Sequence, residues 1–108
     1  MNQISKVSLS PPKQRLIELM QDINFGRITN ISVRDGEPEL THESVIECEI
    51  KFSGQNGPRP EIHRDDFALK QEVVELFYQF SRMGTGTVRE LSIKAGLPFL
   101  MRIEHWAV

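Results

Sequence analysis

The sequence predicts a two-layer α+β domain with its elements in the order helix, strand, strand, helix, strand, strand. Three observations support this. Apolar residues recur at helical spacing in two segments, they alternate with polar residues in others, and the two halves of the chain resemble each other. Two amphipathic helices and one apolar sheet face must bury one another. We therefore expect both helices on one face of a mostly antiparallel four-stranded sheet.

Length and composition indicate one globular domain that spans residues 1–108. Of its residues, 39% are hydrophobic and 26% are charged, which is ordinary for a folded protein. The net charge of -2 argues against a dedicated nucleic-acid-binding protein, because such proteins usually carry a basic excess. A single cysteine, Cys48, excludes an intramolecular disulfide and favours a reducing compartment. No apolar run is long enough for a signal peptide or a membrane span, so we predict a cytoplasmic protein without membrane association.

An internal repeat relates the two halves of the chain. Residues 26–40 align without gaps on residues 86–100, with two glycines, a serine, a proline and the final leucine identical. Upstream, residues 16–20 match residues 73–77 once a few residues are inserted before the second glycine. Chance similarity is the alternative. We interpret the match as a pseudo-duplication, with units at about 10–53 and 65–106 joined by a loop at 54–64.

In the first unit, the helix is expected to begin with Ser10 as N-cap and Pro11 in the first turn. The helix has one apolar stripe, formed by Leu16, Leu19, Met20 and Ile23. Residues 37–43 are too polar for a core and predict a long loop. Beyond them, Ile46, Cys48, Ile50 and Phe52 alternate with charged residues, which predicts a half-buried strand over about 45–52.

The second helix is expected to open at Asp65 or Asp66, where a carboxylate suits the free N–H groups, and to end at the glycines 84 and 86. Its apolar stripe comprises Leu69, Val73, Leu76, Phe77 and Phe80. A final half-buried strand is predicted by the alternation of Leu97, Phe99, Met101 and Ile103. A three-residue loop over 94–96, with Gly96 at positive φ, would keep that strand in phase with the preceding one.

In the first strand of each hairpin, the alternation of apolar and polar residues is interrupted. Ile28 is out of phase with Ile31 and Val33, and Val88 is out of phase with Leu91 and Ile93. A β-bulge in each strand, near residues 29–30 and 89–90, would restore the phase.

Residues that could carry catalysis do not form a recognisable grouping. His42, His63 and His105 lie in different expected elements without metal-ligand spacing, so we predict no metal site and no cofactor. Cys48 is in phase with Ile46 and Ile50 and is interpreted as a small core residue rather than a nucleophile. The chain has no phosphate loop and no nucleophile elbow. These observations favour a non-catalytic protein over an enzyme.

The candidate ligand site is the loop before the second helix, with Arg59, His63 and Arg64 near the helix N-terminus. Arginines beside free N–H groups can hold a phosphate or a carboxylate. Asp65 and Asp66 compete for the same N–H groups, and an ordered crossover loop without a ligand is the alternative reading. A small-molecule or enzymatic site around His63 is the weakest of these hypotheses.

The outer sheet face is predicted to carry mixed charges and no aromatic residues, unlike an RNA-binding sheet. It would be solvated or contact another protein. The candidate interface residues are Trp106, which could instead fold back on the core, and the outward-facing Leu100. Sheet edges also invite pairing with a second subunit. We expect a non-catalytic protein-interaction or scaffold module that binds a protein partner or forms a homodimer, with nucleic-acid or anionic-ligand binding as the alternative.

Overall fold

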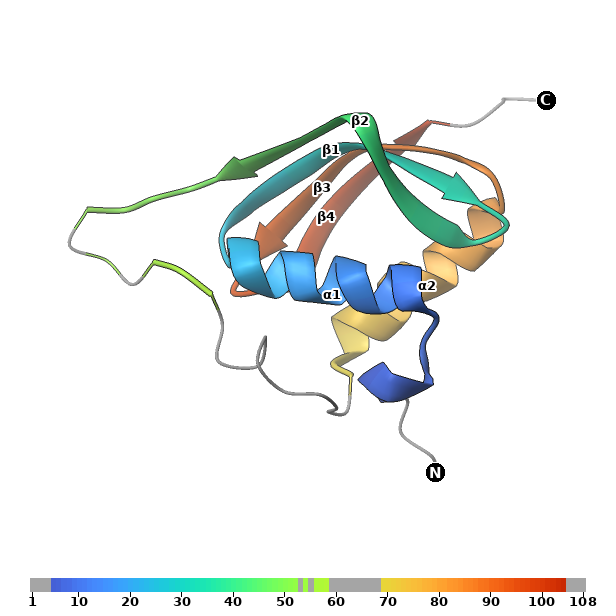
Figure 1. Cartoon of the computed structure of the whole chain (residues 1–108), viewed down its shortest axis with the longest axis horizontal. Coiled ribbons are helices and arrows are strands. Elements are labelled where there is room, and N and C mark those ends of the chain that lie inside the picture. The colour runs from blue at the N-terminus through green and yellow to red at the C-terminus, as the bar shows by residue number, and fades with distance from the viewer. Residues whose placement is uncertain (1–4, 53, 55, 59–68, 105–108) are drawn as a thin grey trace.

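The computed structural model describes residues 5–52, 54, 56–58 and 69–104. A short 3-10 turn at Lys6–Ser8 leads into the regular elements, which are α1 (Pro11–Ile23), β1 (Gly26–Arg34), β2 (Glu37–Cys48), α2 (Gln71–Met83), β3 (Gly86–Lys94) and β4 (Leu97–Glu104). The strands form one antiparallel sheet in the order β2-β1-β3-β4. Both helices lie on the same face of this sheet (Figure 1), so the predicted α+β architecture is confirmed.

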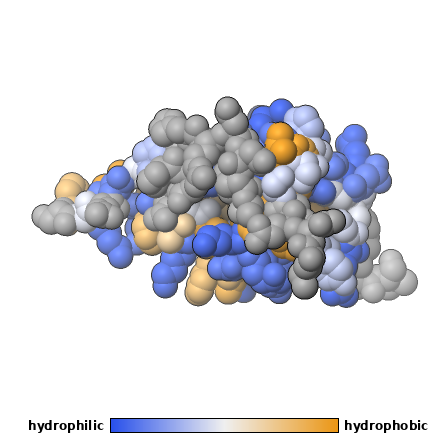
Figure 2. Space-filling model, turned by 90° about the horizontal axis from the view of Figure 1, so that it is seen from below, coloured by the Kyte–Doolittle hydropathy of each residue, from blue (hydrophilic) through white to orange (hydrophobic). Residues whose placement is uncertain are grey.

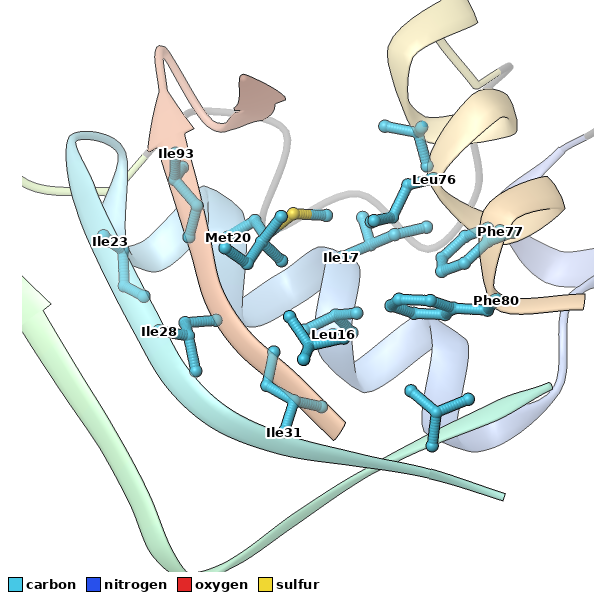
Figure 3. Packing of buried hydrophobic residues seen from close by; sticks show 14 residues of the cluster. Leu16, Ile17, Met20, Ile23, Ile28, Ile31, Leu76, Phe77, Phe80 and Ile93 are labelled. Carbon is cyan, nitrogen blue, oxygen red and sulfur yellow. The ribbon is translucent and has the colours of Figure 1, made fainter. Parts of the chain in front are cut away.

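The core fills the space between the helices and the two central strands (Figure 3). Its fully enclosed members come from both halves of the chain; they include Ile17, Met20, Ile28, Ile31, Phe80, Val88 and Leu91. The Phe77 and Phe80 rings are tilted against each other with centroids 5.9 Å apart. One continuous core therefore joins the two halves, as the apolar stripes of the helices predicted.

The two predicted β-bulges are present. The pairing of β1 with β2 shifts at Asn30, and the pairing of β3 with β4 shifts at Arg89. Asn30 has a φ of 59°. These irregularities bring Ile28 into the same buried layer as Ile31, and Val88 into the same layer as Leu91.

The predicted start of the first helix is confirmed and that of the second is wrong. Ser10 is the N-cap residue of α1, although its hydroxyl accepts no hydrogen bond from the helix N–H groups and instead donates one to the Glu37 carboxylate at 2.6 Å. The N-cap residue of α2 is Lys70, and the helix begins at Gln71. Asp65 and Asp66 lie outside the described residues. A local capping preference of about 1 kcal/mol is easily outweighed by packing of the apolar face.

Both halves of the chain have corresponding elements at a constant offset of 60 residues. The helices begin at 11 and 71 and end at 23 and 83, and the following strands begin at 26 and 86. The insertion predicted upstream of the second glycine is therefore wrong, since the helix bounds place position 16 opposite 76. A duplication of the chain stays a prediction.

Both hairpins turn through two residues at positive φ, Asp35 and Gly36 in the first and Ala95 and Gly96 in the second. Positive φ at both central positions is typical of a type I′ turn. The positive φ of Gly96 is as predicted. The predicted three-residue loop is wrong, because β3 extends to Lys94 and β4 begins at Leu97, which leaves a two-residue turn. A register shift near the start of β4 then displaces Phe99, which is 69% exposed instead of facing the core.

The second strand of the first hairpin differs most from the prediction. β2 begins at Glu37, directly after the turn, so the expected loop over 37–43 is wrong. Residues 41–44 instead bulge outward, because Thr29 faces Val45 whereas Ile31 faces Leu40. A polar sequence is tolerated here because β2 is an edge strand and most of its residues are exposed.

Candidate interaction surface

The most distinctive surface is the segment of residues 45–52, which we name the arm. It comprises the end of β2 and the chain that follows, and it extends away from the body of the molecule (Figure 1). Its apolar side chains are exposed, with Ile46 46%, Ile50 66% and Phe52 95% accessible. Apolar atoms are visible on this projection at the left of Figure 2. The prediction that this strand is half-buried is wrong.

The reason lies in how far the helices extend. Ile46 is paired with the buried Ile28 and so faces the helix side of the sheet, but it lies on the edge strand. α1 ends at Ile23, and the apolar side chains of the arm beyond that point are exposed. Cys48, predicted to be a buried core residue, is exposed for the same reason.

The arm has one apolar side and one charged side. Glu47 faces Arg27 across the strands, on the side of the sheet opposite to the helices. Lys51 Nζ lies 3.8 Å from Glu49 Oε1, as expected for side chains two residues apart in an extended chain. Glu47, Glu49 and Lys51 therefore project to the outer side, whereas Ile46, Cys48 and Ile50 project to the helix side.

The backbone of the arm is paired along one edge. The Glu49 N–H donates to the Phe25 carbonyl at 2.8 Å, so the N–H and C=O groups of the odd-numbered arm residues point toward β1. Beyond the start of β1, the Asn56 side chain takes over this role. Its Oδ1 accepts from the Lys51 N–H at 3.0 Å, and its Nδ2 donates to the Lys51 carbonyl at 2.8 Å.

The opposite edge of the arm has no neighbouring strand in the described sheet. The alternation of an antiparallel strand points the backbone groups of Ile46, Cys48 and Ile50 toward this edge. Such a row of donors and acceptors can accept another extended chain.

Two contacts hold the arm at its base. An added Cβ at Gly26 would lie 2.0 Å from the Glu47 carbonyl oxygen, so only glycine permits this close approach of β1 and β2. Farther along, the Ser44 hydroxyl donates to the Asn30 carbonyl at 2.6 Å, and the Asn30 amide donates to the Glu43 carbonyl at 3.2 Å. The path of the arm is thus set where it leaves the sheet.

A shallow cleft of about 800 Å³ lies beside the arm, and its lining includes Arg27, Glu47, Ser92, Lys94 and Phe99. Lys51 Nζ is 6.0 Å from the centre of the Phe25 ring, and Lys94 Nζ is 5.6 Å from that of Phe99. Two aromatic rings thus border the outer sheet face. The prediction that this region has no aromatic residues is wrong, because Phe25 lies just before β1 and the register shift in β4 displaces Phe99.

Electrostatics limit what this cleft can bind. Arg27 forms an ion pair with Glu47 and lies 3.5 Å from Glu90. The hydrogen bond that Arg27 donates to the Glu47 carboxylate, followed by the charge of that carboxylate, raises the pKa of Arg27. An anionic aromatic ligand could stack here between lysines, but Glu47 and Glu49 also line the cleft and would repel it.

Most of the predicted site residues lie outside the described part of the chain. These are Arg59, His63, Arg64 and Trp106, whose roles stay predictions. Leu100 is 41% exposed on β4 and is paired with Ser92. It lies at the sheet edge opposite to the arm, so the structure does not bring the two together.

The exposure of the arm could have been predicted from the sequence by comparing the number of alternating apolar segments with the two helices available to cover them. The two helices are 13 residues each, and the alternating apolar residues of β1 and β3 already occupy them. The alternating segment of β4 adds Leu97 and Met101 at the border of the core, and a further alternating segment, at 46–52, remains exposed.

Within the described ranges, no three or more His, Cys, Asp and Glu side chains are grouped so that they could hold a metal ion. The helices resolved there are also too short and too polar to cross a bilayer. Comparison with protein-family models, curated proteins and solved structures found no match for this chain. Its function must therefore be argued from its own surface.

Proposed function

We propose that this chain is a non-catalytic protein-interaction module and that the arm is its contact surface. The observation that carries the proposal is the row of exposed apolar residues Ile46, Cys48, Ile50 and Phe52, which runs from the end of the edge strand β2 into the chain that follows it. Burying one large apolar side chain fully contributes about 1.5–3 kcal/mol. A partner that covers several of them would therefore gain substantial free energy.

The geometry supports binding by strand addition. The backbone groups on the free edge can hydrogen bond to an extended segment, while the apolar side chains of the arm provide contacts on one side. The outer charges of Glu47, Glu49 and Lys51 would then select among partners. A cytoplasmic location is part of this proposal, since an exposed cysteine thiol suits a reducing compartment.

The alternative, binding of nucleic acid or of an anionic ligand through Arg59, His63 and Arg64, stays a prediction. The lysine–phenylalanine pairs of the neighbouring cleft give it some support, but the carboxylates there and the net charge of -2 oppose it. We therefore favour a protein partner.

Site-specific photocrosslinking in cells tests the proposal. A benzophenone amino acid at position 52 replaces one exposed aromatic residue by another, and the same replacement at Tyr78 is the matched control, since Tyr78 is 60% exposed on α2. We expect a discrete covalent adduct, identified by mass spectrometry, at position 52 and not at position 78.

A second substitution separates specific contact from mere proximity. In the chain with the crosslinker at position 52, Ile50→Glu should reduce the adduct by roughly tenfold, because a buried carboxylate opposes the apolar contact. Absence of an adduct at position 52, or equal labelling at positions 52 and 78, would refute the proposed contact surface.

A further inference from the structure

We infer that the partner of the arm is a second copy of this chain, and that two arms pair antiparallel with Ile50 facing Ile50 across a twofold axis. This inference rests on the proposed function, since it names the partner of that same surface. The pairing would join two four-stranded sheets edge to edge. It follows from which backbone N–H and C=O groups of the arm point to the free edge, and from the order of the side chains along the arm.

The registers that can form are restricted by which residues direct their backbone N–H and C=O groups to the free edge. The free edge carries the N–H and C=O groups of Ile46, Cys48 and Ile50, all at even positions. In an antiparallel pair the hydrogen-bonded residues face each other directly, so even positions of one arm must face even positions of the other. Ile50 facing its own copy satisfies this condition and brings Cys48 beside position 52, which lies in the turn that the Gly54 N–H closes onto the Lys51 carbonyl.

Among the registers in which even positions face even positions, charge complementarity favours the one with Ile50 on the axis. With Ile50 on the axis, Glu49 of each arm faces Lys51 of the other, which gives two opposite-charge pairs and no like-charge pair. Moving the axis to Cys48 would place Glu47 against Glu49 twice. An axis at Glu49 would place Glu49 against its own copy, although Glu47 would then face Lys51 twice, and an axis at Lys51 would place Lys51 against its own copy.

The apolar side of the arm is self-complementary in the same register. Ile50 meets Ile50 on the axis, and the exposed Phe52 of each arm lies in the turn beside Cys48 of the other. The Glu49 and Lys51 side chains lie 3.8 Å apart within one arm, but they are 60% and 73% exposed and are therefore accessible to the charges of a second arm. The inner edge of Lys51 is already closed by Asn56, so only the outer edge can accept the second arm.

The structure offers a less suitable edge at β4, which argues that pairing occurs through the arm. Pro98 removes one backbone donor there, and the register shift displaces Phe99. The charges of β4 are also engaged within the sheet, since Arg102 lies 4.0 Å from Glu90 and Glu104 lies 3.8 Å from Arg89.

A charge-swap experiment on the full chain tests both the partner and the register. The oligomeric state is measured by sedimentation equilibrium, and the wild type is expected to dimerise. Glu49→Lys alone and Lys51→Glu alone each convert two attractive cross-strand pairs into repulsive ones. Each should weaken the dimer by roughly tenfold or more, on the scale known for such pairs.

Mixing gives the decisive comparison. An equimolar mixture of the Glu49→Lys and Lys51→Glu chains should form heterodimers, because every position 49 then faces an opposite charge at position 51. The double variant E49K/K51E should dimerise with itself. A variant that merely misfolded would not be rescued by mixing. Single variants that dimerise like the wild type, or a mixture that stays monomeric, would overturn the register and with it the inference.

Covalent trapping provides an independent check on the axis. In a Cys48→Ser background, Ile50→Cys should form an intermolecular disulfide on mild oxidation, whereas Glu47→Cys should remain mostly unlinked, because only position 50 faces its own copy. Equal linkage at both positions would contradict the axis.

The outcomes also separate this inference from the proposed function. A strictly monomeric wild type, together with an adduct at position 52 to a different protein, would overturn the second copy as partner and leave the interaction surface intact. A monomer with no adduct at position 52 would contradict both.

Discussion

At the scale of single residues, glycine matters most where two strands approach too closely for any side chain. Gly26 opens β1 opposite Cys48, and a Cβ there would lie 2.0 Å from the Glu47 oxygen, 2.9 Å from Ile23 Cγ2 and 3.1 Å from Cys48 Cα. Two of these atoms belong to the backbone of β2, so the contact cannot be relieved by rotating a side chain. Gly26 therefore sets the position from which the arm departs.

Gly26→Ala should destabilise the protein by roughly 3 kcal/mol, the upper range for overpacking, since β2 must shift away from β1. Gly84→Ala is the control, because Gly84 also has positive φ but no atom lies within 4 Å of its added Cβ. Its expected cost is about 1 kcal/mol, from the positive φ alone. Urea unfolding measures both values, and similar costs for the two variants would contradict the steric role of Gly26.

At the scale of elements, β2 shows how an edge strand can accept a sequence that no central strand would. Its bulge at residues 41–44 is closed by the Ser44 hydroxyl, which donates to Asn30 and accepts from the Thr41 N–H at 2.9 Å. This local network lets β2 regain its pairing with β1 at Val45. The register of the arm against β1 therefore depends in part on the Ser44 side chain.

Ser44→Ala should weaken the pairing of β1 with the second half of β2. Two hydrogen bonds are lost, each contributing about 1 kcal/mol. Hydrogen exchange should quicken at the amides of Val45 and Glu47, which pair with β1, and stay unchanged in α1. Ser8→Ala is the control, since its hydroxyl bonds to the Ser5 carbonyl at 2.7 Å far from β2. Unchanged exchange at Val45 in the Ser44 variant would show that the bulge is held by other contacts.

At the scale of the whole molecule, two reciprocal hydrogen bonds connect the halves. The Gly36 N–H donates to the Gly84 carbonyl, and the Gly96 N–H donates to the Asn24 carbonyl, both at 2.8 Å. Each bond links the hairpin turn of one half to the helix end of the other, at positions 60 residues apart. Together with the antiparallel pairing of β1 and β3, they give the molecule an approximate internal twofold arrangement. We expect the two halves to fold as one cooperative unit.

Phe80→Ala tests this cooperativity. Phe80 is fully buried, so its truncation should cost roughly 4 kcal/mol through lost contacts and a cavity. Because the core is shared, exchange protection should fall in α1 as much as in α2, with a single thermal transition retained. Phe99→Ala, at a 69% exposed position, should change stability by less than about 0.5 kcal/mol. Loss of protection confined to α2 would instead indicate two independent halves.

The sequence by itself determined the class of fold, the order of the elements and the two bulges. These depend on periodicity, which is local: Ile28 and Ile31 can share a buried layer only if the strand is irregular between them. The start of α2 and the length of the second turn were decided by packing and strand register, which local preferences of about 1 kcal/mol do not control.

Only the tertiary structure decided whether residues 46–52 are buried or exposed. Their alternation is the same whether the apolar side meets a helix or remains exposed, because the pattern records an apolar face and not what covers it. Two short helices fill their contacts on β1 and β3, so the edge strand carries its apolar side beyond the core. The sequence predicted a half-buried strand, and the finite reach of the helices leaves its apolar side exposed.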